Sequence, residues 1–215
     1  MAALSEHGQF ELNGASGVLA WAATWRPKTD GAQCGDSFLV RRVMGSFLIA
    51  AIDGAGSGER AATAAAACRE ALVDLPPQPN LDGYFAAAHQ ACRGTRGAAL
   101  ALALIEPIAR HLVWSAIGDI DGLLVRHAGA KVFRRESILQ RGGTIGYRLP
   151  GSLCQIHSIA PGDTLIFISD GIRQSFRNAA IGEAPVREIT ANIMKHHRRE
   201  NDDAMVLATR IEEPT

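Results

Sequence analysis

Residues 47–58 read FLIAAIDGAGSG: an apolar run from Phe47 to Ile52, the pair Asp53-Gly54, and a glycine-rich turn. A strand that ends in an aspartate and a glycine turn presents a carboxylate beside an open backbone carbonyl, and hard divalent cations bind both kinds of oxygen. The alanine-rich stretch Glu59 to Asp74 comes next and predicts a helix, which Pro76-Pro77 ends. This part of the chain therefore predicts a buried strand that delivers Asp53 to a cation.

Further acidic residues stand at the edges of other predicted strands: Asp36, the pair Asp170-Gly171, and the pair Asp202-Asp203. A single Asp-Gly pair is more often an ordinary turn than a metal ligand. The prediction therefore depends on four carboxylates together, Asp36, Asp53, Asp170 and Asp202, which we expect to meet at one metal centre. Asp203 is either a solvated neighbour of Asp202 or a hydrogen-bond acceptor for the preceding turn.

Two cations held by these residues would suit phosphate ester hydrolysis. We expect Asp53 to bridge both ions, the Gly54 carbonyl to add a ligand, Asp170 and Asp202 to complete the first ion, and Asp36 to reach the second directly or through a water. Such a centre deprotonates a bridging water and stabilises the attacking and leaving oxygens of an in-line displacement at phosphorus. Oxygen ligands suit Mg²⁺ and Mn²⁺. The predicted catalytic residues are Asp53, Asp170 and Asp202.

The order of predicted elements favours antiparallel sheets with helices outside. Helical spacing is found at Glu59 to Asp74, Leu81 to Cys92 and Val186 to His197. The strand-like segments are Val18 to Trp25, Phe38 to Val43, Phe47 to Ile52, Ala98 to Glu106, His111 to Ile117, Gly122 to His127, Lys131 to Arg134, Leu153 to Ser158, Thr164 to Ser169 and Ala204 to Ile211. Strands and helices do not alternate strictly, which argues against a parallel doubly wound fold.

Composition limits the class of protein. The 215 residues are 47% hydrophobic, so residues 1–215 can form one domain with a full core. With 22 basic and 22 acidic residues there is no electrostatic footprint for nucleic acid or a membrane surface. The longest apolar run, Ala98 to Ile105, is too short to cross a bilayer. Four cysteines without Cys-x-x-Cys spacing suggest reduced thiols, and we expect a cytoplasmic protein.

The ordered set of motifs resembles the PPM metal-dependent serine/threonine protein phosphatases, in their bacterial SpoIIE-like branch. The residues that carry the resemblance are Gly35-Asp36-Ser37, Asp53-Gly54-x-Gly-x-Gly, Gly118-Asp119, Ser169-Asp170-Gly171-Ile172 and Asn201-Asp202-Asp203-x-Met-Val. Within that branch, Thr95 to Ala99 and Gly142 to Pro150 look like the RsbX-type group, the small stand-alone phosphatases of bacterial stressosome signalling.

The resemblance implies an α/β (α+β) sandwich of two antiparallel sheets flanked by helices, with two Mn²⁺ or Mg²⁺ ions in a cleft at one edge. It implies that Asp53 bridges the ions, that Asp170 and Asp202 bind the first ion, and that Asp36 supports the water shell of the second. Asp119 matches a position linked in some relatives to a weaker third ion. The implied partners are phosphorylated STAS-domain stressosome proteins, and the oligomeric state stays open.

The chain departs from the family pattern at several positions. Ala55 and Ser57 stand where relatives carry histidines, and Gln174 stands where some have a further acidic ligand. The phosphate-binding arginine of eukaryotic members has no secure counterpart, and Arg26 is interpreted as a surface residue. Two alternatives stay open: a SpoIIE-like phosphatase that acts on an anti-sigma-factor antagonist, and a catalytically silent module that binds phosphoprotein. The stretch Arg135 to Pro150 is either a partner-facing loop or a structural turn.

Overall fold

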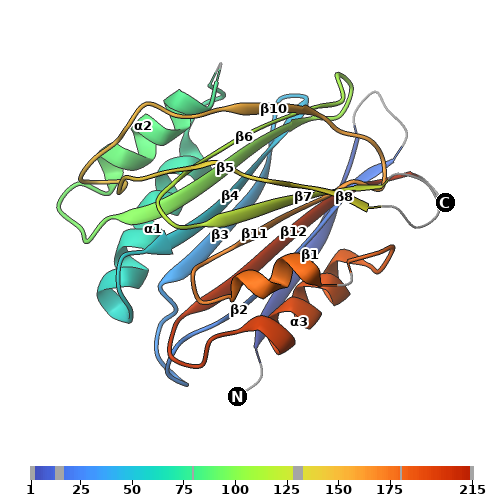
Figure 1. Cartoon of the computed structure of the whole chain (residues 1–215). Helices are drawn as coiled ribbons and strands as arrows, with labels where there is room; N and C mark the ends of the chain where they lie inside the picture. Colours follow the sequence, from blue (N-terminus) through green and yellow to red (C-terminus); the bar gives the residue numbers. More distant parts are fainter. Residues whose placement is uncertain (1–2, 13–16, 79, 128–132, 180, 214–215) are drawn as a thin grey trace.

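The computed structural model describes residues 3–12, 17–78, 80–127, 133–179 and 181–213. Two β-sheets pack face to face, with α1 and α2 on the outer face of one sheet and α3 on the outer face of the other (Figure 1). This is the predicted α+β sandwich with helices on both sides. Among the described residues, no helix combines the length and the apolar character needed to cross a membrane.

The first sheet has the strand order β1-β2-β12-β11-β7-β8, and every pairing in it is antiparallel. Its strands are β1 (Leu4–Glu11), β2 (Val18–Arg26), β12 (Ala204–Glu212), β11 (Thr164–Ile168), β7 (Asp121–His127) and β8 (Phe133–Ser137). Strand β1 was not predicted, because its side chains are mostly polar and exposed and it lies at the edge of the sheet. The predicted strand Lys131 to Arg134 begins outside the described residues, and β8 extends beyond its end.

The second sheet has the order β10-β6-β5-β4-β3, with β9 joined to β6. Its strands are β10 (Gln155–Ser158), β6 (His111–Ile117), β5 (Ala98–Glu106), β4 (Ser46–Gly54), β3 (Asp36–Val43) and β9 (Gln140–Arg141). The pairing of the two-residue strand β9 with β6 is parallel, whereas the other strand pairings of this sheet are antiparallel.

The helices are α1 (Glu59–Asp74), α2 (Leu81–Ala91) and α3 (Val186–His197), with a 3₁₀ helix, η1 (Gln174–Asn178), that was not predicted. Helix α2 begins after Asn80, whose side chain accepts a hydrogen bond from the backbone N–H of Gly83 at 3.3 Å. The last turn of helix α3 contains Lys195, a cation that interacts favourably with the exposed carbonyls of a helix C-terminus.

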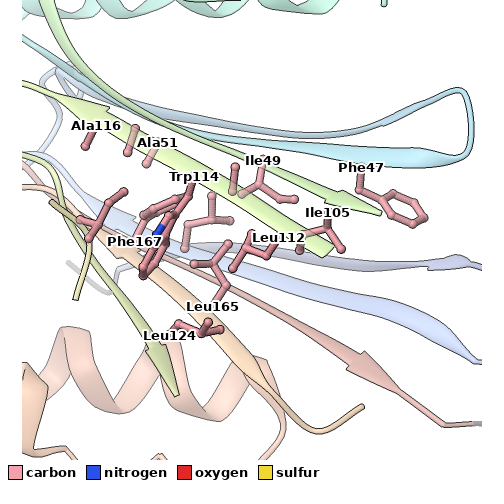
Figure 2. Packing of buried hydrophobic residues seen from close by; sticks show 14 of the residues in the cluster. Phe47, Ile49, Ala51, Ile105, Leu112, Trp114, Ala116, Leu124, Leu165 and Phe167 are labelled. Carbon is pink, nitrogen blue, oxygen red and sulfur yellow. The ribbon is translucent and has the colours of Figure 1, made fainter. Parts of the chain in front are cut away.

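Both faces of β4 are covered, which explains its unbroken apolar sequence. Phe47, Ile49 and Ala51 face the space between the sheets, whereas Leu48 and Ile52 face α1 and α2. Each buried Phe, Leu or Ile side chain of this strand stabilises the fold by about 1.5–3 kcal/mol. Figure 2 shows the layer between the sheets, where the rings of Trp114 and Phe167 lie 6.3 Å apart between their centroids.

Candidate active site

Four strand ends meet at one edge of the sandwich. In the second sheet, Asp36 at the start of β3 lies directly opposite Asp53 near the end of β4. In the first sheet, β11 ends just before Asp170, and its antiparallel neighbour β12 begins just after Asp202. The end of one antiparallel strand lies beside the start of the next, so each sheet contributes two acidic residues to this edge.

A cleft of about 450 Å³ opens at this edge and is lined by Asp53, Asp119, Asp170 and Asp202. Asp119 lies in the turn that carries the chain from β6 in the second sheet to β7 in the first. Asp36 is not among the lining residues: it lies behind Asp53 and is only 7% exposed. The structure thus brings all five aspartates of the sequence prediction to one region.

The carboxyl groups at this edge of the sandwich have raised pKa values. Burial, followed by the charges of Asp36 and Asp170, raises the pKa of Asp53 to about 9. Burial raises the pKa of Asp36 to about 8, with the Ser169 hydrogen bond opposing the shift. Burial, together with the charge of Asp202, also raises the pKa of Asp170. These carboxyl groups are close enough to repel one another when ionised, so the arrangement costs stability unless positive charge joins it.

The chemistry of the cleft fits a hard divalent cation, because its acidic ligands are all oxygen donors. Within the described part of the chain, however, no three His, Cys, Asp or Glu side chains come close enough together to form a ready-made metal site. The fold supplies the ligands at one edge without assembling them into one coordination sphere.

Two glycines are required here by close backbone contacts. A Cβ atom on Gly54 would lie 2.0 Å from the carbonyl oxygen of Ala61 in α1, and one on Gly171 would lie 1.8 Å from the carbonyl oxygen of Asp203. Real Cβ atoms do not approach backbone oxygens so closely. The two Asp-Gly pairs thus combine an acidic residue with the one residue type that lets α1 and β12 pack against the strand ends.

Ser169 holds Asp36 in place. Its hydroxyl donates a hydrogen bond of 2.6 Å to Oδ2 of Asp36 and accepts one of 2.9 Å from the backbone N–H of Met205. The side chain is fully buried. The sequence analysis used Ser169 only as part of the Ser169-Asp170-Gly171-Ile172 motif, and therefore missed this supporting role.

We expect Ser169→Ala to destabilise the protein by about 1–3 kcal/mol, because it leaves Asp36 and the Met205 N–H without this partner in a buried place. Urea unfolding followed by circular dichroism measures the change. Ser175→Ala is the matched control, since Ser175 is exposed and its hydroxyl is hydrogen-bonded to Nδ1 of His197 at 2.9 Å. Equal stabilities of the two variants would show that Asp36 does not depend on Ser169.

Asp203 is an internal anchor and not a solvated neighbour. Its side chain is 4% exposed. Oδ1 accepts a hydrogen bond from the backbone N–H of Lys28 at 2.7 Å, and Oδ2 accepts one from Gly35 at 2.9 Å. The alternative of a hydrogen-bonding role is therefore correct, but the partner is the loop between β2 and β3. Asp203 ties that loop, and with it Asp36, to the start of β12.

The residues that depart from the family pattern lie around the cleft. Ala55 and Ser57 line it. Gln174, in η1, lines a smaller adjoining cavity of about 160 Å³ together with Arg199, whose charge partly offsets the raised pKa of Asp170. Arg26 is not among the residues that line the cleft; it is partly buried and forms an ion pair with Asp30 at 3.3 Å.

The neighbouring Asp121 has a structural role. Its Oδ1 accepts a hydrogen bond of 2.8 Å from the backbone N–H of the next residue, Gly122. Its Oδ2 accepts a hydrogen bond of 2.6 Å from Nη2 of Arg177. These bonds fasten η1 to the start of β7. The two aspartates therefore differ in role: Asp121 is held by these hydrogen bonds, whereas Asp119 is exposed and lines the cleft.

A larger cavity lies elsewhere. A groove of about 700 Å³ runs between α3 and strands β1 and β2, and both acidic and basic side chains line it. None of the five aspartates is among its lining residues. We assign the site to the smaller cleft because of its chemistry, not its size.

Comparison with known proteins agrees with this assignment. A family model described as Stage II sporulation protein E (SpoIIE) matches residues 44–212. No curated protein sequence matches the chain. A chain from a study of the bacterial stressosome as a modular system adapted to control secondary messenger signalling is 27% identical, with a TM-score of 0.78, and the match covers 89% of this chain and 99% of that one.

Two metal-bound structures share the fold. RsbX in complex with magnesium is 19% identical, with a TM-score of 0.80, over 96% of this chain and 100% of that one. The catalytic domain of the serine/threonine protein phosphatase PstP in complex with two manganese ions is 16% identical, with a TM-score of 0.64, over 91% and 99%. The fold is that of the PPM phosphatases, and the protein is an enzyme of the phosphatase class. The chain belongs to the SpoIIE family.

Proposed function

We propose that this protein is a Mn²⁺- or Mg²⁺-dependent phosphatase that removes phosphate from serine or threonine of phosphorylated STAS-domain stressosome proteins. The observation that supports it most is the cleft lined by Asp53, Asp119, Asp170 and Asp202, with Asp36 buried behind. Mutual repulsion makes such a group of carboxylates unfavourable by itself. Bound cations would neutralise the negative charge of these carboxylates and so offset their mutual repulsion.

In this proposal each acidic residue keeps one role. Asp53 would hold both cations, the Gly54 carbonyl would add a ligand to one of them, Asp170 and Asp202 would hold the first, and Asp36 would support the second. Asp119 would hold a weaker third. When bound, the cations supply charge neutralisation and an activated water for attack on phosphorus. No side-chain nucleophile is required.

The chain's own residues prepare this site. The hydrogen bond from Ser169 fixes Asp36, and Asp203 fixes the loop that leads to it. The close packing of α1 at Gly54 holds the end of β4. Because the carboxyl groups are not yet gathered in one coordination sphere, we infer that cation binding draws them together.

The stressosome assignment is supported by two relatives. The 27% identical chain comes from a stressosome study, and the RsbX chain is matched over its whole length. We further propose that residues 1–215 form one domain and that the protein acts in the cytoplasm. The alternative substrate is a phosphorylated anti-sigma-factor antagonist.

The deciding experiment measures phosphate release from a phosphorylated STAS-domain scaffold protein and from a phosphorylated anti-sigma-factor antagonist, with Mn²⁺ and with Mg²⁺. Faster release from the scaffold protein supports the proposal, and the reverse favours the alternative. Isothermal titration with Mn²⁺ runs in parallel. A protein that binds no metal and releases no phosphate from either substrate, or from para-nitrophenyl phosphate, would be a silent phosphoprotein-binding module.

Lys28 is the cation among the described residues that line the cleft. Its backbone is anchored by Asp203, while its exposed ammonium group forms no ion pair within the described residues. A phosphate monoester carries two negative charges near neutral pH, so a cation at the mouth of the cleft favours its binding.

We expect Lys28→Gln to raise KM for para-nitrophenyl phosphate by about 5–10-fold, equivalent to about 1 kcal/mol, and to change kcat less. Competitive inhibition by inorganic phosphate should weaken by the same factor. Lys195→Gln is the matched control, because Lys195 lies on α3 beside the other groove. Unchanged phosphate inhibition in Lys28→Gln would remove Lys28 from the substrate site.

A further inference from the structure

Two loops form one rim of the cleft. The segment 92–97 follows α2, and the segment 141–148 connects β9 towards β10. They are held together where the first loop enters β5, by backbone hydrogen bonds in both directions between Ala98, the first residue of β5, and Ile145, at 3.0 and 2.8 Å. The backbone N–H of Gly146 also donates to Nδ1 of His89 at 3.0 Å. These hydrogen bonds hold the two loops side by side, so that the loops form one continuous surface.

This surface reaches the cleft directly. Gly143 and Thr144 of the second loop line the cleft. From the first loop, the guanidinium group of Arg96 lies over Gly56, another lining residue: a Cβ atom there would be 2.5 Å from Nη1 of Arg96. The Gly97 carbonyl accepts a hydrogen bond of 2.9 Å from Ala55 in the same turn. A substrate protein whose phosphate enters the cleft can therefore contact this rim.

The rim carries only positive charge. In the chain as a whole the charges are balanced, with 22 basic and 22 acidic residues. The two ranges that contain the loops, residues 83–105 and 137–162, together have four arginines and no aspartate or glutamate. These are Arg93, Arg96, Arg141 and Arg148, and all four are exposed. None of them forms an ion pair with another described residue.

An aromatic ring completes the surface. Tyr147 is 70% exposed, and its ring lies against Gly97, where an added Cβ atom would be 3.0 Å from Cδ2. Exposed tyrosine and arginine side chains are the types enriched where proteins bind one another. An unpaired basic surface with an aromatic residue is complementary to an acidic polypeptide segment.

We propose that this arginine rim, defined as Arg93, Arg96, Arg141, Arg148 and Tyr147, recognises acidic residues that flank the phosphorylated serine or threonine of the substrate. The inference rests on the proposed function and adds the chemistry of the substrate segment. The cleft itself is lined by aspartates and would repel such flanks. The rim offers them a separate place with the opposite charge.

The test compares two fluorescein-labelled phosphothreonine peptides of equal length, one with glutamates on both sides of the phosphothreonine and one with glutamines at those positions. Anisotropy titrations with the Mn²⁺-loaded protein measure binding, and phosphate release measures turnover separately. We expect the glutamate peptide to bind about tenfold or more tightly, from several weak charge pairs acting together. That preference should shrink between about 50 mM and about 500 mM NaCl, as the Debye length falls below about 10 Å.

Two charge-reversal variants localise the effect. Arg96→Glu combined with Arg148→Glu should abolish or reverse the preference. Arg187→Glu combined with Lys195→Glu changes the charge equally on α3, beside the other groove, and should keep it. The readout is the ratio of the two peptides within one protein preparation, so a general loss of activity or folding cancels.

The outcomes separate the two claims. Equal binding of both peptides by the unmodified protein, or a ratio kept by the Arg96→Glu/Arg148→Glu variant, would overturn the rim inference even if both peptides are hydrolysed. A tenfold binding preference without any phosphate release would support the rim and overturn the proposed catalytic function.

Discussion

Replacing Asp53 by Asn is expected to abolish phosphatase activity while making the metal-free protein more stable. Asp53 lies where both sheets bring their acidic residues together, so its loss should lower kcat/KM for para-nitrophenyl phosphate by roughly 10³-fold, the scale seen when a group that stabilises transition-state charge is removed. Its buried carboxyl, by contrast, is unfavourable without a cation. A neutral amide of the same shape relieves that cost.

The pH dependence gives the sign of this effect. The pKa of Asp53 is raised in the folded protein from its ordinary value of 3.8 to about 9. The folded state therefore binds a proton that the unfolded state has lost, and the stability of the metal-free protein falls as pH rises from about 4 towards 9. Asp53→Asn should weaken this fall. Near pH 8 we expect it to be more stable by at least about 1 kcal/mol, or about 2–4 °C in Tm.

Differential scanning calorimetry in the presence of a chelator, at pH 5 and pH 8, measures this difference, and para-nitrophenyl phosphate with Mn²⁺ measures the activity. The control is Asp82→Asn, an exposed position in the first turn of α2, for which both quantities should stay close to those of the unmodified protein. Full activity in Asp53→Asn would eliminate the proposed centre. A lower Tm in Asp53→Asn at pH 8 would show that its carboxyl group stabilises the fold instead.

Replacing Gly54 by Ala should disrupt the fold at the site, although alanine has the same backbone carbonyl. The new Cβ atom would lie 2.0 Å from the Ala61 carbonyl oxygen, so α1 or the end of β4 must move. We expect a loss of about 3 kcal/mol or more, a fall in Tm of about 6–12 °C, and loss of Mn²⁺ binding as Asp53 is displaced.

Gly45→Ala is the control, because a Cβ atom there meets nothing within 4 Å and the backbone is not in the left-handed region. It should leave Tm and Mn²⁺ affinity nearly unchanged. If Gly54→Ala unfolds like Gly45→Ala and still binds Mn²⁺, then the close contact with α1 is not what requires glycine at this position.

Local patterns in the sequence were sufficient for most elements. The apolar runs of β4, β5 and β11, with glycine turns at their ends, predicted strands whose positions the structure confirms, and the helical spacing of residues 59–74 and 186–197 matches α1 and α3. Strand β1 was not predicted, because its polar, exposed residues at a sheet edge show no such pattern.

The acidic residues themselves could be read from the sequence, because an aspartate at the end of a buried strand is unusual enough to stand out. That they share one cleft depends on the antiparallel register of β3 with β4 and of β11 with β12, which local sequence does not encode. The same holds for Ser169, Asp203, Lys28 and the arginine rim: each acts through a partner distant in sequence. Residue type and local pattern determined which groups are present, and only long-range packing decided which of them meet.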